Sequence, residues 1–395
     1  QLLLDAIGSA TQTLVITYTG ANEYTGQPRP PAVPIAELID TLASTVTEPL
    51  DDLVTRHPLQ PFDIQNVQPD ALVPETPFTF DRTVLDTARA MAGERAPQPV
   101  FVSGPLPAPP TEDVSLADLV AFFKNPVKGF FRALDYTLPW DVDGVSDVMP
   151  VEIDALQEWT VGDRLLGDIL RGMTPQDAQQ AEWRRGTLPP GKLGWRRAIE
   201  LRDQAALLAA EALRYRRTDG RAFDVDIDLG AGRRLTGTVN NVFGDHLVGV
   251  PTYSKLGGQH LLASWIPLLA LTAQRGQRWS AVCIGRPPRG TTPRVQRLDG
   301  PNDAVSLLGD LVAMYDEGRR RPLPLPIKTS YAWAGAVQAG DDPAQAANYR
   351  WRNERDDPAI ERVWGRDPDL SDLTGLDEYA RRLWLPLLHA EGGSA

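Results

Sequence analysis

The chain has 395 residues, enough for two or more domains, and its 42% content of hydrophobic residues allows a sizeable globular core. Its net charge of −12 argues against a stand-alone nucleic-acid-binding protein, which is usually basic, but is compatible with local basic patches. The single cysteine, Cys283, excludes a disulfide framework and fits a cytosolic compartment.

The sequence carries no segment that targets a membrane. No apolar run reaches the length of a membrane span, and no signal peptide is recognisable. We therefore expect a cytoplasmic protein with no membrane partner. Because the chain begins with Gln1 and not with Met, we also expect it to be a fragment of a longer protein.

The first part of the chain alternates short structured stretches with proline-rich ones. Leu14–Thr19 is an apolar, β-branched run that predicts a buried strand, and Ile35–Thr47 has apolar residues at helical spacing. Ala96–Pro110 is dense in proline and indicates a linker. We place a domain boundary between residues 1–112 and 113–395.

The second region opens with helices whose first residues carry capping signals. Ser115 followed by Asp118 resembles a capping box, and Asn125–Pro126 is typical of an N-cap followed by the first helical residue. Further helices are predicted over 156–171, 175–185, 194–215, 302–318 and 377–388.

The stretch 223–284 predicts a strand-rich core. Strands are predicted over Asp224–Leu229, Arg234–Phe243, His246–Val250 and Ser280–Ile284. Before the last strand, the stretch 259–273 is apolar on nearly every side, as in a helix buried within an α/β core.

This order of elements resembles the PD-(D/E)XK nuclease fold, so we expect an α/β fold with a degenerate nuclease-like domain. In that fold the second strand supplies an Asp and the third a (D/E)-x-Lys, and the carboxylates bind Mg²⁺. Here Asn240 or Asn241 stands where the Asp is expected. The third strand, taken to continue through Lys255, has Tyr253 two residues before that lysine. Amide and phenol groups cannot replace two carboxylates, so we predict an inactive site without metal.

Two alternatives remain open. An active metal-dependent DNA nuclease would need unusual ligands, and Asp245 in the turn after the second strand, Glu211 on the preceding helix and Lys255 are the candidates. A purely structural module that contacts no DNA is the second alternative.

The segment Gly186–Leu193 matches part of a phosphate-binding loop but lacks its chemistry. It reads G-x-x-x-x-G-K, yet Leu193 replaces the Ser or Thr that holds Mg²⁺, and two prolines remove N–H donors. We interpret it as a helix–helix turn and expect neither ATP nor another cofactor. The four histidines show no metal-ligand spacing.

Basic residues cluster around this turn. Arg184, Arg185, Lys192, Arg196 and Arg197 join it to the start of a core helix. Such residues often serve solubility or surface ion pairs, but this group also suits contacts with DNA phosphates. We name them as candidate DNA-binding residues.

Three segments give the sequence a family resemblance. His57–Phe62 (HPLQPF), Ser115–Tyr136 (SLADLVAFFKNPVKGFFRALDY) and Arg184–Gly194 (RRGTLPPGKLG) resemble the C-terminal part of RecC, the gamma subunit of bacterial exodeoxyribonuclease V, RecBCD. The resemblance runs over most of the chain, which would cover only part of the much longer RecC.

The resemblance carries its own expectations. It implies that residues 1–112 are the tail of a helicase-like region and that residues 113–395 are an inactive nuclease-like domain. RecC subunits hold RecB and RecD together, help split the DNA duplex and scan the exiting strand for Chi. The resemblance therefore implies a non-catalytic subunit in double-strand break repair, with RecB-like and RecD-like subunits and DNA as partners. It carries no Chi-reading residue over to this chain.

Overall fold

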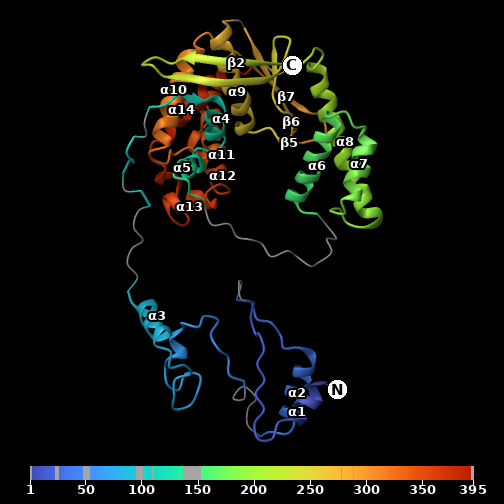
Figure 1. Cartoon of the computed structure of the whole chain (residues 1–395), viewed down its shortest axis with the longest axis vertical. Helices are drawn as coiled ribbons and strands as arrows, with labels where there is room; N and C mark the ends of the chain where they lie inside the picture. Colours follow the sequence, from blue (N-terminus) through green and yellow to red (C-terminus); the bar gives the residue numbers. More distant parts are fainter. Residues whose placement is uncertain are drawn as a thin grey trace. The chain divides into compact units, whose positions relative to one another are not determined.

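The structure is a computed structural model that describes residues 2–22, 26–47, 54–94, 101–102, 104–108, 111–136, 153–276, 278–287 and 289–392. Much of the predicted linker 96–110 lies outside these residues. The chain forms two compact units, Gln1–Pro99 and Val100–Ala395 (Figure 1). The boundary suggested after residue 112 stays a prediction. None of the described helices has both the length and the apolar character that crossing a bilayer requires.

The first unit consists of short helices joined by extended segments. Its elements are α1 (Leu2–Gly8), α2 (Val33–Ala43), the 3₁₀ turn η2 (Ile64–Asn66) and α3 (Arg82–Ala92). Of its described residues, only Asn66 and Ala88 are buried. The Asn66 amide donates to the carbonyls of Gln60 and Pro61 at 3.1 and 3.0 Å, and so holds the HPLQPF segment in place.

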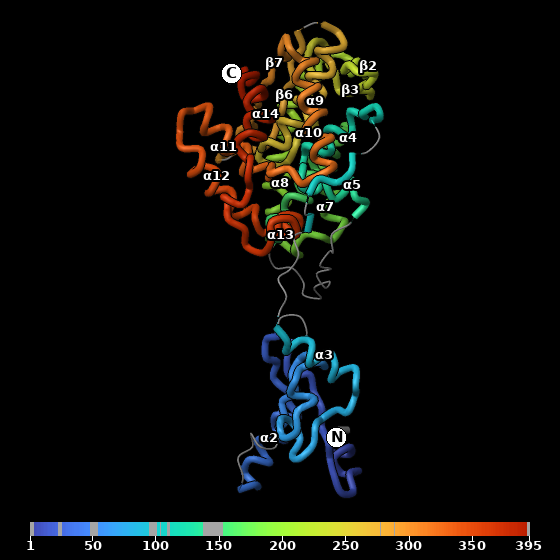
Figure 2. The backbone as a smooth tube through the Cα atoms, turned by 90° about the vertical axis from the view of Figure 1, so that its left-hand side faces the viewer, coloured from blue at the N-terminus to red at the C-terminus, as the bar shows by residue number. Residues whose placement is uncertain are grey.

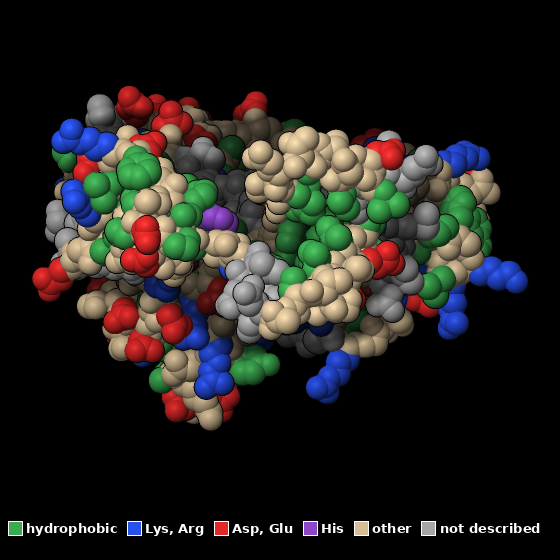
Figure 3. All heavy atoms as spheres, turned by 90° about the horizontal axis from the view of Figure 1, so that it is seen from below, with side chains coloured by type: hydrophobic (Ala, Val, Ile, Leu, Met, Phe, Trp, Pro, Cys, Tyr) green, Lys and Arg blue, Asp and Glu red, His purple; other side chains and the backbone are tan. Residues whose placement is uncertain are grey.

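The strand predicted at Leu14–Thr19 is not formed. The segment is assigned no strand, pairs with none among the described residues, and leaves Val15 78% exposed. The prediction was wrong because a β-strand needs a partner for its N–H and C=O groups, and an apolar pattern does not supply one. Apolar side chains at the surface are visible in green in the space-filling view of Figure 3. The helix predicted over 35–47 is confirmed as α2.

The second unit contains a seven-stranded sheet and eleven α-helices among its described residues. The strands are β1 (Val114–Ser115), β2 (Arg221–Asp228), β3 (Arg234–Phe243), β4 (His246–Val248), β5 (Thr252–Lys255), β6 (Ser280–Arg286) and β7 (Arg294–Asp299). The helices are α4 (Leu116–Lys124), α5 (Pro126–Ala133), α6 (Ala155–Leu170), α7 (Pro175–Arg184), α8 (Gly191–Tyr215), α9 (Gly258–Arg275), α10 (Ala304–Gly318), α11 (Ile327–Ala339), α12 (Pro343–Trp351), α13 (Pro358–Trp364) and α14 (Leu376–His389), with a 3₁₀ turn η3 (Leu370–Asp372).

The predicted capping signals start α4 and α5. The Ser115 hydroxyl accepts a hydrogen bond from the Asp118 N–H at 3.5 Å, and the Asn125 side chain accepts one from the Lys128 N–H at 3.0 Å. Pro126 takes the first helical position, where its missing N–H costs no bond. The two short helices therefore begin where their sequence signals place them.

The sheet is mixed. β3 pairs antiparallel with β2 along one edge, and with β1 (parallel) and β4 (antiparallel) at successive places on the other. β4 continues the sheet to β6 in parallel, and β6 pairs antiparallel with β7. The α/β fold class is thus confirmed, while a likeness to the PD-(D/E)XK fold stays a prediction.

Helices cover both faces of this sheet. Residues alternate along β6, so that Ala281 and Cys283 belong to one apolar core and Val282 and Ile284 to the other. α8 and α6 pack on the second face, and α9 packs on the first with α4 and α10 outside it. Figure 1 shows α6, α7 and α8 side by side, and Figure 2 shows α10 and α14 beside α9.

The third strand is broken where the sequence suggested continuity. β4 ends at Val248 and β5 begins at Thr252, with Pro251 between them. Proline has no N–H to donate to a ladder, which explains the break. β5 then pairs with the end of β6 and not with β3.

Candidate functional site

The predicted helix–helix turn joins α7 to α8. The Gly186–Pro190 segment lies between these helices, with Leu188 and Pro189 buried. A β-carbon at Gly194 would overlap the carbonyl oxygen of Pro189, so a glycine is needed where the turn crosses the first turn of α8. The turn is therefore a packed structural connection, as the sequence predicted.

The five predicted DNA-binding cations lie around this turn, but they are not equally free. Arg197 pairs with Glu158 of α6 and with Glu200 at 2.5 Å. Burial opposes its charge, yet these hydrogen bonds outweigh that effect and raise its pKa. Its guanidinium therefore ties α8 to α6.

The other four cations point to solvent. Arg185 pairs with Glu182 at 3.3 Å, and Arg196, whose side chain is 83% exposed, is 3.5 Å from Glu200. The Arg196–Glu200 pair is exposed and holds the Arg196 side chain weakly, whereas Arg185 pairs with a carboxylate that is only 1% exposed. Arg184 and Lys192 are exposed as well. Arg184, Lys192 and Arg196 can therefore turn toward an anionic partner.

Glu182, in the last turn of α7, has a buried carboxylate. It is 1% exposed and accepts two hydrogen bonds from Arg164 of α6 and one from the Thr187 hydroxyl at 3.0 Å. The hydrogen bonds with Glu182 raise the pKa of Arg164. A carboxylate with this set of partners fixes α7 against α6.

An aromatic pair at the same place was missed from the sequence. Trp183 lies in the last turn of α7 and Trp195 near the start of α8, and their ring centroids lie 5.2 Å apart at 89°. Trp195 remains 38% exposed. The signal was present as two tryptophans, each followed by two arginines, on either side of the turn.

The asparagines of the predicted degenerate nuclease site lie at a β-bulge. Pairing shifts from Phe223–Val239 to Arg221–Val242, so β3 has one extra residue there. Asn241 has a φ of +60°, a left-handed conformation that Asn adopts more readily than most residues. Asn240 and Asn241 are both exposed.

Tyr253 is sealed beneath α6. It is 1% exposed, a β-carbon at Gly162 would overlap its ring, and the Arg286 guanidinium lies 4.5 Å from the ring centroid. Burial raises the pKa of the phenol, which therefore stays neutral. The Trp159 Nε1 donates to the Ser254 hydroxyl at 2.8 Å and fastens α6 to the same strand.

The four residues of this predicted site are not brought together on paired strands. Asn240 and Asn241 are on β3, whereas Tyr253 and the exposed Lys255 are on β5, which does not pair with β3. Tyr253 and Lys255 also differ in burial, because the β5 register shifts between Thr252 and Lys255. The assignment of these residues to a degenerate nuclease site stays a prediction.

The unusual ligand set of an active nuclease has no support in this geometry. The Ser280 N–H at the start of β6 donates to the Asp245 carbonyl at 3.3 Å, while Lys255 is paired in the sheet with Arg286 at the end of β6. Since a strand rises about 3.3 Å per residue, these ends lie about 20 Å apart. Glu211 is paired with Arg214 at 3.0 Å. Within the described residues, no group of three His, Cys, Asp or Glu side chains could hold a metal ion.

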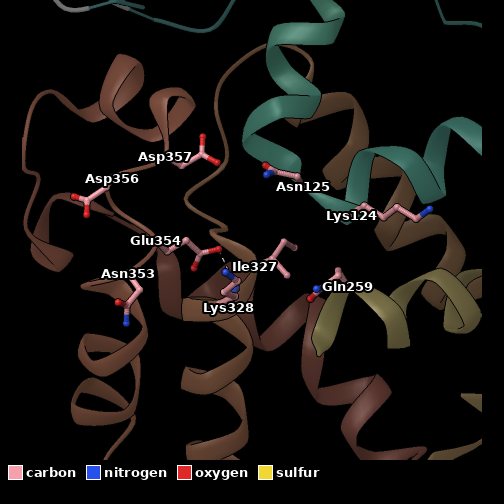
Figure 4. A pocket seen from close by; sticks show the side chains of 9 residues that line it. All are labelled: Lys124, Asn125, Gln259, Ile327, Lys328, Asn353, Glu354, Asp356 and Asp357. Atoms are coloured by element: carbon pink, nitrogen blue, oxygen red, sulfur yellow. Dashed lines mark hydrogen bonds between the residues drawn. The ribbon is translucent and has the colours of Figure 1, made fainter. Parts of the chain in front are cut away.

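A separate pocket of about 430 Å³ lies among the starts of α5, α9, α11 and α13. Figure 4 shows Glu354 pointing at the beginning of α11, where it accepts from the Lys328 and Thr329 N–H groups at 3.1 and 2.8 Å. Asp357 accepts from the Ala359 N–H and pairs with Lys128 at 2.8 Å. These carboxylates cap helices, so their role is structural.

Comparison with known proteins finds one matching family model and several similar sequences. The family model of the RecC C-terminal domain matches residues 111–338, more than half of the chain. The chain is 69% identical to "RecBCD enzyme subunit RecC" of Mycolicibacterium smegmatis and 56% identical to that of Mycobacterium tuberculosis, over 99% of this chain. It is 27% identical to the Escherichia coli subunit over 98% of its length. It spans 38% of the two mycobacterial relatives and 36% of the third. The chain belongs to the RecC C-terminal domain family.

Proposed function

We propose that this chain is a non-catalytic part of a RecBCD-type helicase–nuclease, acting in the cytoplasm in double-strand break repair. It docks RecB-like and RecD-like subunits and guides DNA. Its relatives bear the name of a RecBCD subunit. The observation that carries the proposal is Tyr253, a neutral phenol sealed under α6 two residues before Lys255, where the (D/E)-x-Lys pattern requires a carboxylate.

The proposal includes a degenerate PD-(D/E)XK fold for the second unit and a helicase-like tail for residues 1–112. Support for the former comes from the order α8, β2, β3, β4, β5, α9, β6, with β2–β3–β4 antiparallel and both β4 and β5 parallel to β6. In that arrangement Asn240 and Asn241 occupy the second strand, as amides that bind Mg²⁺ poorly.

A cleavage assay tests the absence of catalysis. The chain is incubated with single- and double-stranded DNA and Mg²⁺ or Mn²⁺, and we expect no cleavage above that of a Lys255→Ala variant. Robust metal-dependent cleavage that the variant lacks would overturn the proposal.

A co-purification experiment tests partner docking. The chain is co-expressed with tagged RecB-like and RecD-like subunits, and we expect it to be retained with them. A Lys192→Glu/Arg196→Glu variant serves as the matched control, because both residues are exposed and neither is in the packed turn. Failure of the unaltered chain to associate with either subunit contradicts the docking proposal.

The same variant tests DNA guidance against the purely structural alternative. DNA affinity of the assembled complex is measured at several salt concentrations. If Lys192 and Arg196 neutralise phosphates, the variant should bind more weakly and with a shallower salt dependence, the slope falling by about one unit for each phosphate left without its cation. Unchanged affinity and slope favour a module that does not contact DNA through this turn.

A further inference from the structure

We propose that the start of α8 is a stacking site for a base of single-stranded DNA, with Trp195 against the base and Lys192 and Arg196 on the neighbouring phosphates. The inference rests on the proposed DNA contact of the α7–α8 turn and names the strand type and the mode of binding.

The three side chains lie close together in the first turns of α8. Lys192 lies three residues before Trp195 and four before Arg196, which places the lysine next to both side chains on the surface of α8. Trp195 keeps 38% of its surface exposed, and the Arg196 side chain keeps 83%. An indole is thus flanked by two cations that can reach solvent.

The indole is also held in place. The Trp183 ring packs at 89° against the Trp195 ring, with the centroids 5.2 Å apart. Beneath it, the close approach of Gly194 to the Pro189 carbonyl fixes the first turn of α8. A platform ordered before binding loses less conformational entropy when a base stacks on it.

The combination favours a single strand over other partners. Cations alone would bind duplex and single strands through their phosphates. An exposed indole adds affinity only where a base has left its stack, and base–aromatic stacking tolerates any sequence. Arg184, exposed at the end of α7, extends the positive side chains beside Trp183, so the surface complements a polyanion better than an apolar protein segment.

The test compares three probes on the full chain and on its complex with the RecB-like and RecD-like subunits. The probes are an oligothymidine, an abasic oligonucleotide of equal length and a duplex of equal length. Trp195→Ala should weaken oligothymidine binding by about 5- to 150-fold, the range given by stacking of one base, and leave the other two affinities unchanged. Trp195→Phe should retain most of the oligothymidine affinity, which separates stacking from a folding defect.

Two further variants complete the design. Lys192→Ala/Arg196→Ala should weaken all three probes and lower the salt slope. Tyr349→Ala is the matched control, because Tyr349 of α12 is 68% exposed and has the Arg350 guanidinium 5.5 Å from its ring centroid, away from the α7–α8 turn. It should leave every affinity unchanged.

The outcomes separate this inference from the function on which it rests. Base stacking is overturned if Trp195→Ala weakens the binding of all three probes equally, or if it weakens none of them. This holds even if Lys192→Ala/Arg196→Ala still weakens DNA binding. Loss of subunit association in Trp195→Ala with unchanged DNA affinity overturns it in favour of a protein contact. Absence of DNA binding by the unaltered chain and complex rejects the DNA contact itself.

Discussion

Gly162 of α6 lies against the ring of Tyr253 in β5 so closely that any β-carbon at residue 162 would overlap the ring. The glycine lets α6 press directly on β5. Together with the hydrogen bond from Trp159 to Ser254, it closes this part of the sheet.

Substituting Gly162 with Ala should destabilise the chain by about 1–3 kcal/mol, because the added methyl group overpacks the α6–β5 contact. The midpoint of urea unfolding measures the change. Gly167→Ala is the matched control in the same helix, since its β-carbon would meet only the end of the flexible Arg171 side chain, at 3.3 Å. The control should be neutral or stabilising, because Ala favours helix over Gly. Equal losses in both variants would contradict the proposed role of the Gly162 contact.

Replacing Glu182 by Gln should cost about 2–3 kcal/mol of stability. The change removes the negative charge of a carboxylate that accepts hydrogen bonds from the Arg164 guanidinium and the Thr187 hydroxyl. That side chain is 1% exposed, so water does not replace the lost interaction. Denaturant unfolding again provides the measurement. Glu361→Gln, at an exposed pair with Arg366, should leave the midpoint nearly unchanged. If the two variants behave alike, Glu182 does not anchor α7.

The thiol of Cys283 should be unreactive in the folded chain. Burial in β6 raises its pKa to about 11, and only the thiolate is a good nucleophile. Iodoacetamide labelling followed by mass spectrometry should be slow in buffer and fast in denaturant. Rapid labelling of the native chain would show that the core around β6 opens readily.

Much of the second unit could be predicted because its signals are local. The bounds of β3 match the alternation of Arg234–Phe243, and α4 and α5 begin directly after Ser115 and Asn125, whose side chains cap N–H groups in the first turn. Each of these signals lies within a few residues of the element it specifies.

Other elements depend on distant partners and were missed. α11 packs on both α12 and α14, so its apolar residues do not form a single stripe. β7 contains Arg294 and Arg297 and is recognisable as a strand only once β6 lies beside it. For the same reason, Leu14–Thr19 looked like a strand although no described segment pairs with it.

The candidate site shows the same limit. Sequence placed Arg184, Lys192 and Arg196 at one turn, and the structure shows which of the cations there are already engaged. It could not show that Gly162 of α6 seals Tyr253, because these residues are far apart in the chain.

Stability should fall on acidification because of His260 in the first turn of α9. Its Nδ1 accepts a hydrogen bond from the Gly257 N–H at 3.1 Å, which requires a neutral ring with its proton on Nε2. Burial, aided by the nearby Lys124 ammonium, lowers its pKa below the ordinary 6.5. Once the pH falls below the ordinary pKa of 6.5, the unfolded chain binds a proton at His260 more readily than the folded chain does. The contribution of His260 to stability is therefore present at higher pH and is lost as the pH falls through the lowered pKa.

His260→Gln should remove that part of the pH dependence. Gln at this third helical position can still accept from the N-cap N–H, but it cannot take up a proton, so stability at pH 7.5 should be kept and the melting temperature should fall less by pH 5. His389→Gln, at an exposed position at the end of α14, is the matched control and should melt like the unaltered chain at both values. If His260→Gln and the unaltered chain lose the same stability between pH 7.5 and pH 5, the ring of His260 does not control the acid sensitivity. The source would then be carboxylates that pair with arginine, such as Glu317 with Arg321.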